Sequence, residues 1–198
     1  MFGKKRIYLD RAAGVSANPS SPHDEGRRAK QMLEDARTSI ARLVEVQADD
    51  VIFTSGATEA NALAILGTVR SKQKTADSGK VHALYLPSAH ASVVENMKLL
   101  AEDGAIVEEL PIRDARVDTE ALAKMLRLET VLVSMDAVCG ETGVVWNTRE
   151  VAQVLRQWDV RHPQQLWMSD IHKSRPFLHV DASQAPLTEK MTRAHFDA

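Results

Sequence analysis

The chain of 198 residues has an ordinary globular composition, with 44% hydrophobic and 26% charged residues, which excludes a disordered or low-complexity protein. Its 25 basic and 27 acidic residues give a net charge of −2, so the overall charge favours neither nucleic acid nor an anionic membrane as a partner. The single cysteine, Cys139, excludes an internal disulfide and a multi-cysteine metal site. No segment fits a membrane span or a signal peptide, and we expect a soluble, cytoplasmic protein.

The first part of the chain is predicted to contain a short strand, a loop and a long helix. Residues 7–9 are apolar and indicate a strand, and the glycine, asparagine and prolines of residues 11–23 indicate a loop. Over residues 24–44 apolar side chains recur every three or four positions, which predicts an amphipathic helix. We therefore expect an N-terminal segment at residues 1–23 and the main domain at residues 24–198.

Strands and helices are predicted to alternate along the rest of the chain. The apolar runs that predict strands are at residues 51–54, 82–86, 106–110, 130–135 and 177–180. The helical spacings are at residues 59–69, 92–100, 119–126 and 148–158. Residues 71–80 are predicted to be a polar surface loop, and residues 159–176 an irregular insertion. This alternation predicts an α/β fold, a mainly parallel sheet with helices on both faces.

In such a sheet, ligands bind beyond the carboxyl ends of the strands, so the residues that follow the strands are the candidates for a site. Residues 54–59 place Gly56 at a helix start whose N–H groups suit a phosphate, although a plain N-cap has the same pattern. His90 is either a ring-stacking or proton-transferring group or a surface histidine at a helix start. Asp181 ends a buried strand, where it needs a cation such as a protonated pyridine nitrogen, or backbone N–H groups to cap.

These three features, taken together, suit one cofactor. A phosphate site, a histidine for stacking or proton transfer, and a carboxylate for a ring nitrogen are what pyridoxal 5'-phosphate (PLP) needs for its chemistry.

Five segments carry a resemblance to a known family. They are residues 8–10 (Tyr-Leu-Asp), 18–23 (Asn-Pro-Ser-Ser-Pro-His), 52–61 (Ile-Phe-Thr-Ser-Gly-Ala-Thr-Glu-Ala-Asn), 141–143 (Glu-Thr-Gly) and 179–184 (His-Val-Asp-Ala-Ser-Gln). With them the chain resembles the class V aminotransferase superfamily, and within it the NifS/IscS-type cysteine desulfurases. The resemblance implies the large domain of a fold type I PLP-dependent transferase, incomplete in this chain, and a homodimer. It implies conversion of L-cysteine to L-alanine, with persulfide sulfur passed to an acceptor protein for iron–sulfur cluster or thiolation pathways.

The resemblance also implies roles for individual residues. Ala57 and Thr58 fall where the family binds the PLP phosphate. His90 falls where the family histidine stacks on the ring and assists proton transfer. Asp181 matches the aspartate that pairs with the ring nitrogen, and Gln184 matches the glutamine that hydrogen-bonds the phenolic oxygen.

Some residues depart from the family pattern. Where the family has two asparagines before Glu-Thr-Gly, this chain has Cys139 and Gly140, and Gly140 has no side chain to contact a cofactor. Cys139 is either a substitute nucleophile or a small buried hydrophobe. The residues that could bind a metal offer no suitable spacing, since His162 and His172 stand ten apart without a neighbouring ligand pair.

The C-terminal end is the largest departure. The family's Schiff-base lysine, persulfide cysteine and small domain would follow residue 198, and Lys190 matches no family lysine. We therefore expect a piece of a longer enzyme, inactive by itself. The alternatives are a truncated, non-catalytic homologue that acts as a dimer partner or remnant, and another class V PLP enzyme such as a selenocysteine lyase.

Overall fold

A computed structural model of the chain describes residues 17–75, 80–161, 175–185 and 190–197. The chain divides into two compact units, the first ending at Ile52 and the second beginning at Phe53. The strand expected at residues 7–9 lies outside the described residues. The expected division after residue 23 stays a prediction. Of the helices in the described ranges, none is both long and apolar enough to cross a membrane.

The N-terminal unit consists mainly of the long helix α1, Asp24–Val44, which begins and ends where the sequence predicts. The helix begins at His23, whose Nδ1 accepts a hydrogen bond from the Gly26 N–H at 3.1 Å. Only glycine fits at residue 26, because a Cβ atom there would lie 2.2 Å from the carbonyl oxygen of Ser21. A short 3-10 helix, η2 (Ala48–Asp50), follows α1.

The strand predicted at residues 51–54 is wrong. These residues form neither a helix nor a strand, and Ile52 is 77% and Phe53 43% exposed. A short apolar run predicts a strand only if a neighbouring strand is there to pair with it, and none of the described strands does. The turn and helix that were expected after this run are nevertheless present.

The described residues of the C-terminal unit contain a four-stranded parallel sheet in the order β2-β1-β5-β6. Its strands are β1 (His82–Tyr85), β2 (Ile106–Glu109), β5 (Thr130–Asp136) and β6 (Phe177–Asp181). Its helices are α2 (Ala57–Thr75), α3 (Ala91–Glu102), α4 (Thr119–Met125) and α5 (Thr148–Arg161). The predicted α/β class is therefore confirmed.

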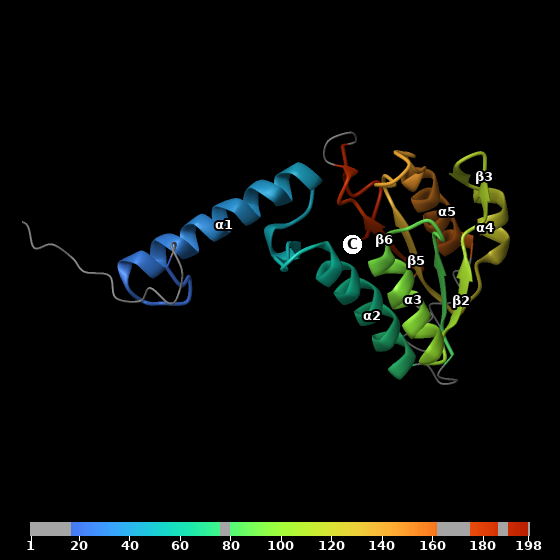
Figure 1. Cartoon of the computed structure of the whole chain (residues 1–198), viewed down its shortest axis with the longest axis horizontal. Coiled ribbons are helices and arrows are strands. Elements are labelled where there is room, and N and C mark those ends of the chain that lie inside the picture. The colour runs from blue at the N-terminus through green and yellow to red at the C-terminus, as the bar shows by residue number, and fades with distance from the viewer. Residues whose placement is uncertain (1–16, 76–79, 162–174, 186–189, 198) are drawn as a thin grey trace, which may run out of the picture. The chain divides into compact units, whose positions relative to one another are not determined.

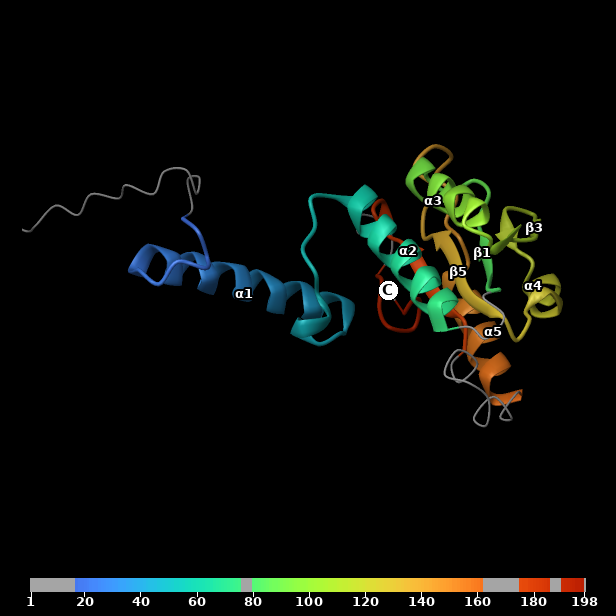
Figure 2. The same cartoon turned by 90° about the horizontal axis from the view of Figure 1, so that it is seen from below.

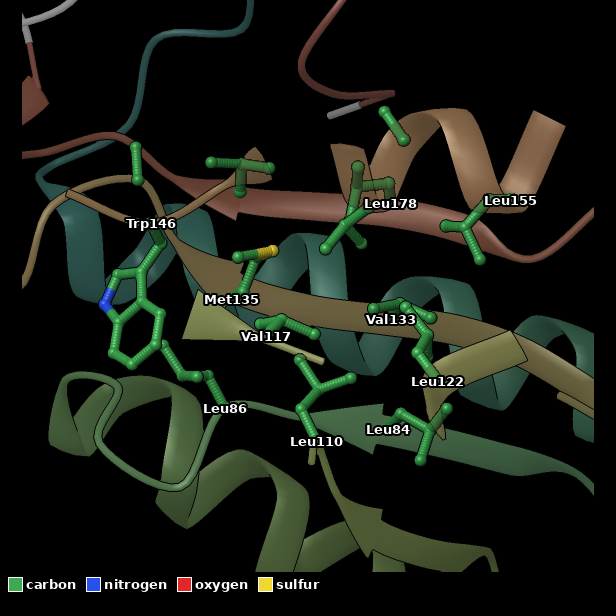
Figure 3. Close-up of a cluster of buried hydrophobic side chains, with 14 of the residues drawn as sticks. Leu84, Leu86, Leu110, Val117, Leu122, Val133, Met135, Trp146, Leu155 and Leu178 are labelled. Atoms are coloured by element: carbon green, nitrogen blue, oxygen red, sulfur yellow. The ribbon is translucent and has the colours of Figure 1, made fainter. Parts of the chain in front are cut away.

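Helices cover both faces of this sheet (Figures 1 and 2). Helices α2 and α3 pack on one face through a cluster that includes Ile65, Met97 and Leu132. Adjacent strand residues point to opposite faces, so Val133, the next residue of β5, belongs to the cluster on the other face, under α4 and α5. Figure 3 shows this second cluster, with Leu155 of α5 near Leu178 of β6.

Some predicted boundaries are corrected by the structure. Helix α2 continues through residues 71–75, which were predicted as loop, because their lysines and glutamine are good helix formers. Helix α5 extends to Arg161, so residues 159–161 are helical, and residues 162–174 of the expected insertion lie outside the described part. A small antiparallel pair, β3 (Ile112–Arg113) and β4 (Arg116–Val117), was not predicted.

Candidate functional site

A cavity of about 410 Å³ lies at the carboxyl ends of β5 and β6, beside the N-terminal ends of α2 and α3. All the residues that the sequence nominates line it. They are Ala57, Thr58, His90, Asp181 and Gln184. The other described residues that line the cavity are Ser55, Gly56, Glu59, Asp136, Val138, Gly140 and Ser183. The parallel sheet explains this gathering, because it brings strand ends that are distant in sequence to one edge.

One end of the cavity is the first turn of α2. The backbone N–H groups at the start of a helix have no acceptor within the helix, so those of Ala57 and Thr58 are suited to an anion. The preceding turn is fixed by side chains, since Ser55 donates from its N–H and its hydroxyl to the Glu59 carboxylate, at 2.7 Å and 2.6 Å. These hydrogen bonds lower the pKa of Glu59. The residues at this end therefore offer donors from the backbone, with the Thr58 hydroxyl available beside them.

His90 caps the start of α3 and also lines the cavity, while its part in ring stacking or proton transfer stays a prediction. Its Nδ1 accepts from the Ser92 N–H at 3.2 Å and lies 2.8 Å from the Ser92 hydroxyl. Because Nδ1 is an acceptor, the proton of the neutral ring lies on Nε2. The ring is held by these contacts, and its Nε2 side remains available to a ligand.

The carboxylate of Asp181, 9% exposed, lies at the end of β6. Its Oδ1 accepts from the N–H and hydroxyl of Ser183 at 3.0 Å and 2.5 Å, and its Oδ2 accepts from the Asn61 amide at 2.7 Å. Burial would raise the pKa of Asp181, but the hydrogen bonds from Ser183 and Asn61 outweigh it and the pKa is lowered. The group is therefore a carboxylate anion at neutral pH, as an aspartate that pairs with a cation must be.

Asn61 links this carboxylate to His90 and was not nominated from the sequence. Only 3% exposed, it donates to Asp181 and also to the Ser92 hydroxyl, at 2.7 Å and 2.9 Å. The Ser92 hydroxyl in turn contacts His90. The sequence does place Asn61 one helical turn after Ala57, and this spacing puts both residues on one side of α2.

Asp136, at the end of β5, was also missed. It is 5% exposed, lines the cavity, and is the register partner of Asp181. Burial, and then the charge of Asp181, raise the pKa of Asp136 to about 7, although the His90 backbone N–H opposes the shift. The sequence marked the end of this strand, but it did not reveal which residue of β6 would stand beside Asp136.

With the geometry established, comparison with known proteins identifies the family. Residues 8–198 match the family described as Aminotransferase class-V. The chain belongs to the class V aminotransferases. It is 31% identical to a mitochondrial cysteine desulfurase of Candida albicans over 93% of its length, and 33% identical to cysteine desulfurase IscS 1 of Archaeoglobus fulgidus over 84%. In each case it spans 38% of the relative's length.

Solved structures agree with the fold of this class V aminotransferase chain. A NifS-like protein matches it with a TM-score of 0.76 and 26% identity, over 95% of this chain and 47% of that one. DndA from Streptomyces lividans matches with a TM-score of 0.69 and 33% identity, over 89% and 44%. The parallel sheet and its helices therefore match those of the NifS-like protein and of DndA.

The departures of this class V aminotransferase chain also have places in the structure. Gly140 lines the cavity beside Gln184, whose Cγ would lie 3.4 Å from a Cβ atom at residue 140. Cys139 is buried and is not among the residues that line the cavity. The Thr142 hydroxyl lowers the pKa of the Cys139 thiol by hydrogen bonding, although burial opposes this. The burial of Cys139 favours a small buried hydrophobe over a substitute nucleophile.

Proposed function

We propose that this chain belongs to a PLP-dependent cysteine desulfurase, which converts L-cysteine to L-alanine and passes persulfide sulfur to an acceptor protein. The observation that carries the proposal is the cavity itself, which is lined by the N-terminal turn of α2, a hydrogen-bonded histidine and a buried carboxylate whose pKa is lowered. The names of its relatives supply the reaction.

The residues of the cavity suit the parts of PLP. The first turn of α2 offers backbone N–H groups and the Thr58 hydroxyl to a phosphate. Asp181 offers an anion that would hold a ring nitrogen in its protonated form. Bound PLP would supply an electron sink for the bonds of the substrate amino acid.

The remaining roles concern ring contacts and protons. His90 would stack on the ring, and its Nε2 would hold or move a proton, because its Nδ1 is already used by Ser92. Gln184 would hydrogen-bond the phenolic oxygen of the cofactor. Ala57 and Thr58 would bind phosphate, and Asp181 would position the ring. Residues 24–198 would form most of the cofactor-binding domain.

The partners and location are also part of the proposal. We infer a homodimer, a sulfur-acceptor protein of an iron–sulfur or thiolation pathway, and no nucleic acid or membrane partner. A cytoplasmic location is proposed from the single cysteine. Fractionation tests this location, since some relatives carry mitochondrial names.

Two measurements test this function. The first is PLP binding to the purified chain, by equilibrium dialysis, with the variant Asp181→Ala and the control Glu102→Ala on the exposed surface of α3. We expect binding by the chain and the control and its loss in Asp181→Ala. Equal retention by all three would remove the ring-nitrogen role. The second measurement is alanine release by the longest native form of the protein with L-cysteine, and its absence would favour a non-catalytic homologue. Faster turnover of L-selenocysteine would favour a selenocysteine lyase.

A further inference from the structure

Two carboxyl groups stand at the same level of the sheet. Asp136 ends β5 and Asp181 ends β6, and the two residues are register partners in a parallel pair. Residues at one level of adjacent parallel strands project their side chains from the same face. Both residues line the cavity, and the charge of Asp181 acts on the Asp136 carboxyl.

The two carboxyl groups differ sharply in their hydrogen bonds. Asp181 accepts from the Ser183 N–H, the Ser183 hydroxyl and the Asn61 amide. Asp136 accepts from the His90 backbone N–H, but its Oδ1 is buried and has no hydrogen-bond partner among the described residues. A buried carboxylate oxygen without a donor is costly, and binding a proton relieves that cost.

The surroundings provide no compensating cation. Among the described residues, no lysine or arginine lines the cavity. The titratable groups that line the cavity with Asp136 are Glu59 of α2, His90 at the start of α3 and Asp181 of β6. Outside this lining, Cys139 interacts with the charge of Asp136, and His179 interacts with that of Asp181. Burial lowers the pKa of His179 to about 4, so it is uncharged at neutral pH. Two adjacent carboxyl groups without a cation share one proton at slightly acidic pH, and the fewer hydrogen bonds of Asp136 place it there.

This inference rests on the proposed function, because it concerns PLP in the same cavity. We propose that Asp136 is a second cofactor-binding carboxyl group, which holds a proton in the ligand-free protein and loses it when the ring N–H⁺ of PLP binds beside Asp181. The O–H bond of Asp136 breaks heterolytically, and the proton passes to solvent. The carboxylate left behind shares the positive charge of the ring, and no oxidation or reduction takes place.

A consequence is that the affinity for PLP depends on pH near neutrality. The pKa of Asp136 is raised to about 7, so the proton is present at slightly acidic pH and must be displaced by the cation there. One linked proton changes a binding constant by at most about tenfold per pH unit. Between about pH 6 and pH 8 the chain should gain close to tenfold in PLP affinity relative to a variant that lacks this proton.

The first test compares PLP affinity across this range in the chain, in Asp136→Asn and in the control Glu102→Gln on the exposed surface of α3. Asparagine keeps the shape of the side chain and an acceptor for the His90 N–H but has no proton to lose. If Asp136→Asn does not fold, Asp136→Ser serves the same purpose. The titration of PLP itself is common to all the proteins and cancels in the ratio.

The second test counts the protons released, by calorimetry of PLP binding in two buffers of different ionisation enthalpy that lack primary amines. We expect the chain and the control to release up to one proton more than Asp136→Asn at about pH 6. Equal proton release, together with equal pH profiles, would overturn the role of Asp136 while PLP binding itself upheld the proposed function. Failure of PLP to bind any of the proteins at any pH would overturn both.

Discussion

Asn61 and Ser92 link Asp181 to His90 by hydrogen bonds. The variant Asn61→Ala tests whether these hydrogen bonds stabilise the folded chain. The substitution removes a hydrogen bond to a carboxylate, at 2.7 Å, and one to the Ser92 hydroxyl, at 2.9 Å. A hydrogen bond to a charged group contributes about 1.5–3 kcal/mol and a neutral one about 1 kcal/mol. Ser183 still hydrogen-bonds Asp181, so we expect the free energy of unfolding to fall by about 2–4 kcal/mol at neutral pH.

The pH dependence separates this effect from a simple loss of packing. The pKa of Asp181 is lowered in the folded chain, so the stability that it contributes is present above its unfolded pKa and is lost as pH falls through the folded pKa. Without Asn61 the pKa of Asp181 rises. The difference in stability between the chain and Asn61→Ala should therefore be largest near neutral pH and shrink in acid.

Urea unfolding followed by circular dichroism, at neutral and at acid pH, measures both quantities. The matched control is Asn96→Ala, because Asn96 donates a neutral hydrogen bond to the Ser92 carbonyl, at 2.6 Å, on the same helix α3. We expect a loss of about 1 kcal/mol in this control, with no dependence on pH. A loss in Asn61→Ala that matched the control, or that was the same at both pH values, would refute the reasoning.

Three further predictions concern other parts of the chain. Gly26→Ala should shorten or displace the start of α1, because its Cβ would lie 2.2 Å from the Ser21 carbonyl oxygen; a far-ultraviolet spectrum with unchanged helix content would contradict this. Leu155→Ala should cost about 2–5 kcal/mol in chemical unfolding, since Leu155 is fully buried, whereas the exposed Leu63→Ala should cost much less. Burial lowers the pKa of His179 to about 4, so the unfolded chain binds its proton first as pH falls, and stability should decline from about pH 6.5 towards pH 4 by at most about 1.4 kcal/mol per pH unit. His179→Gln should flatten the dependence of stability on pH in this range, and an unchanged slope would contradict the lowered pKa of His179.

The sequence predicted the parts of the fold that depend on local pattern. The amphipathic spacing of residues 24–44 gave α1 its bounds, and the buried runs gave the sheet strands. The strand prediction at residues 51–54 failed because Ile52 and Phe53 are exposed and none of the described strands pairs with this run, which no local pattern reveals. Pairing partners are a property of the whole sheet.

The candidate site was predictable to the same degree. Asp181 and His90 could be nominated because each follows a strand, and the structure brings them together. Asn61 could not, because its role depends on contacts with Ser92 and Asp181, which lie 31 and 120 positions away. Asp136 could not be predicted either, because its position beside Asp181 depends on the register of β5 and β6. Long-range register, rather than residue type, determines which groups meet.

The long separation between Asn61 and Asp181 has a consequence for synthesis of the protein. The first turn of α2 and the start of α3 leave the ribosome well before Asp181, which follows Asn61 by 120 positions. The described residues of the cavity therefore come together only after β6 has joined β5, a late and non-local step in folding. Any ligand that needs both ends of the cavity would bind only after this step and would then hold β6 in place. Capture of such a ligand would report that β6 of a newly made chain has paired with β5.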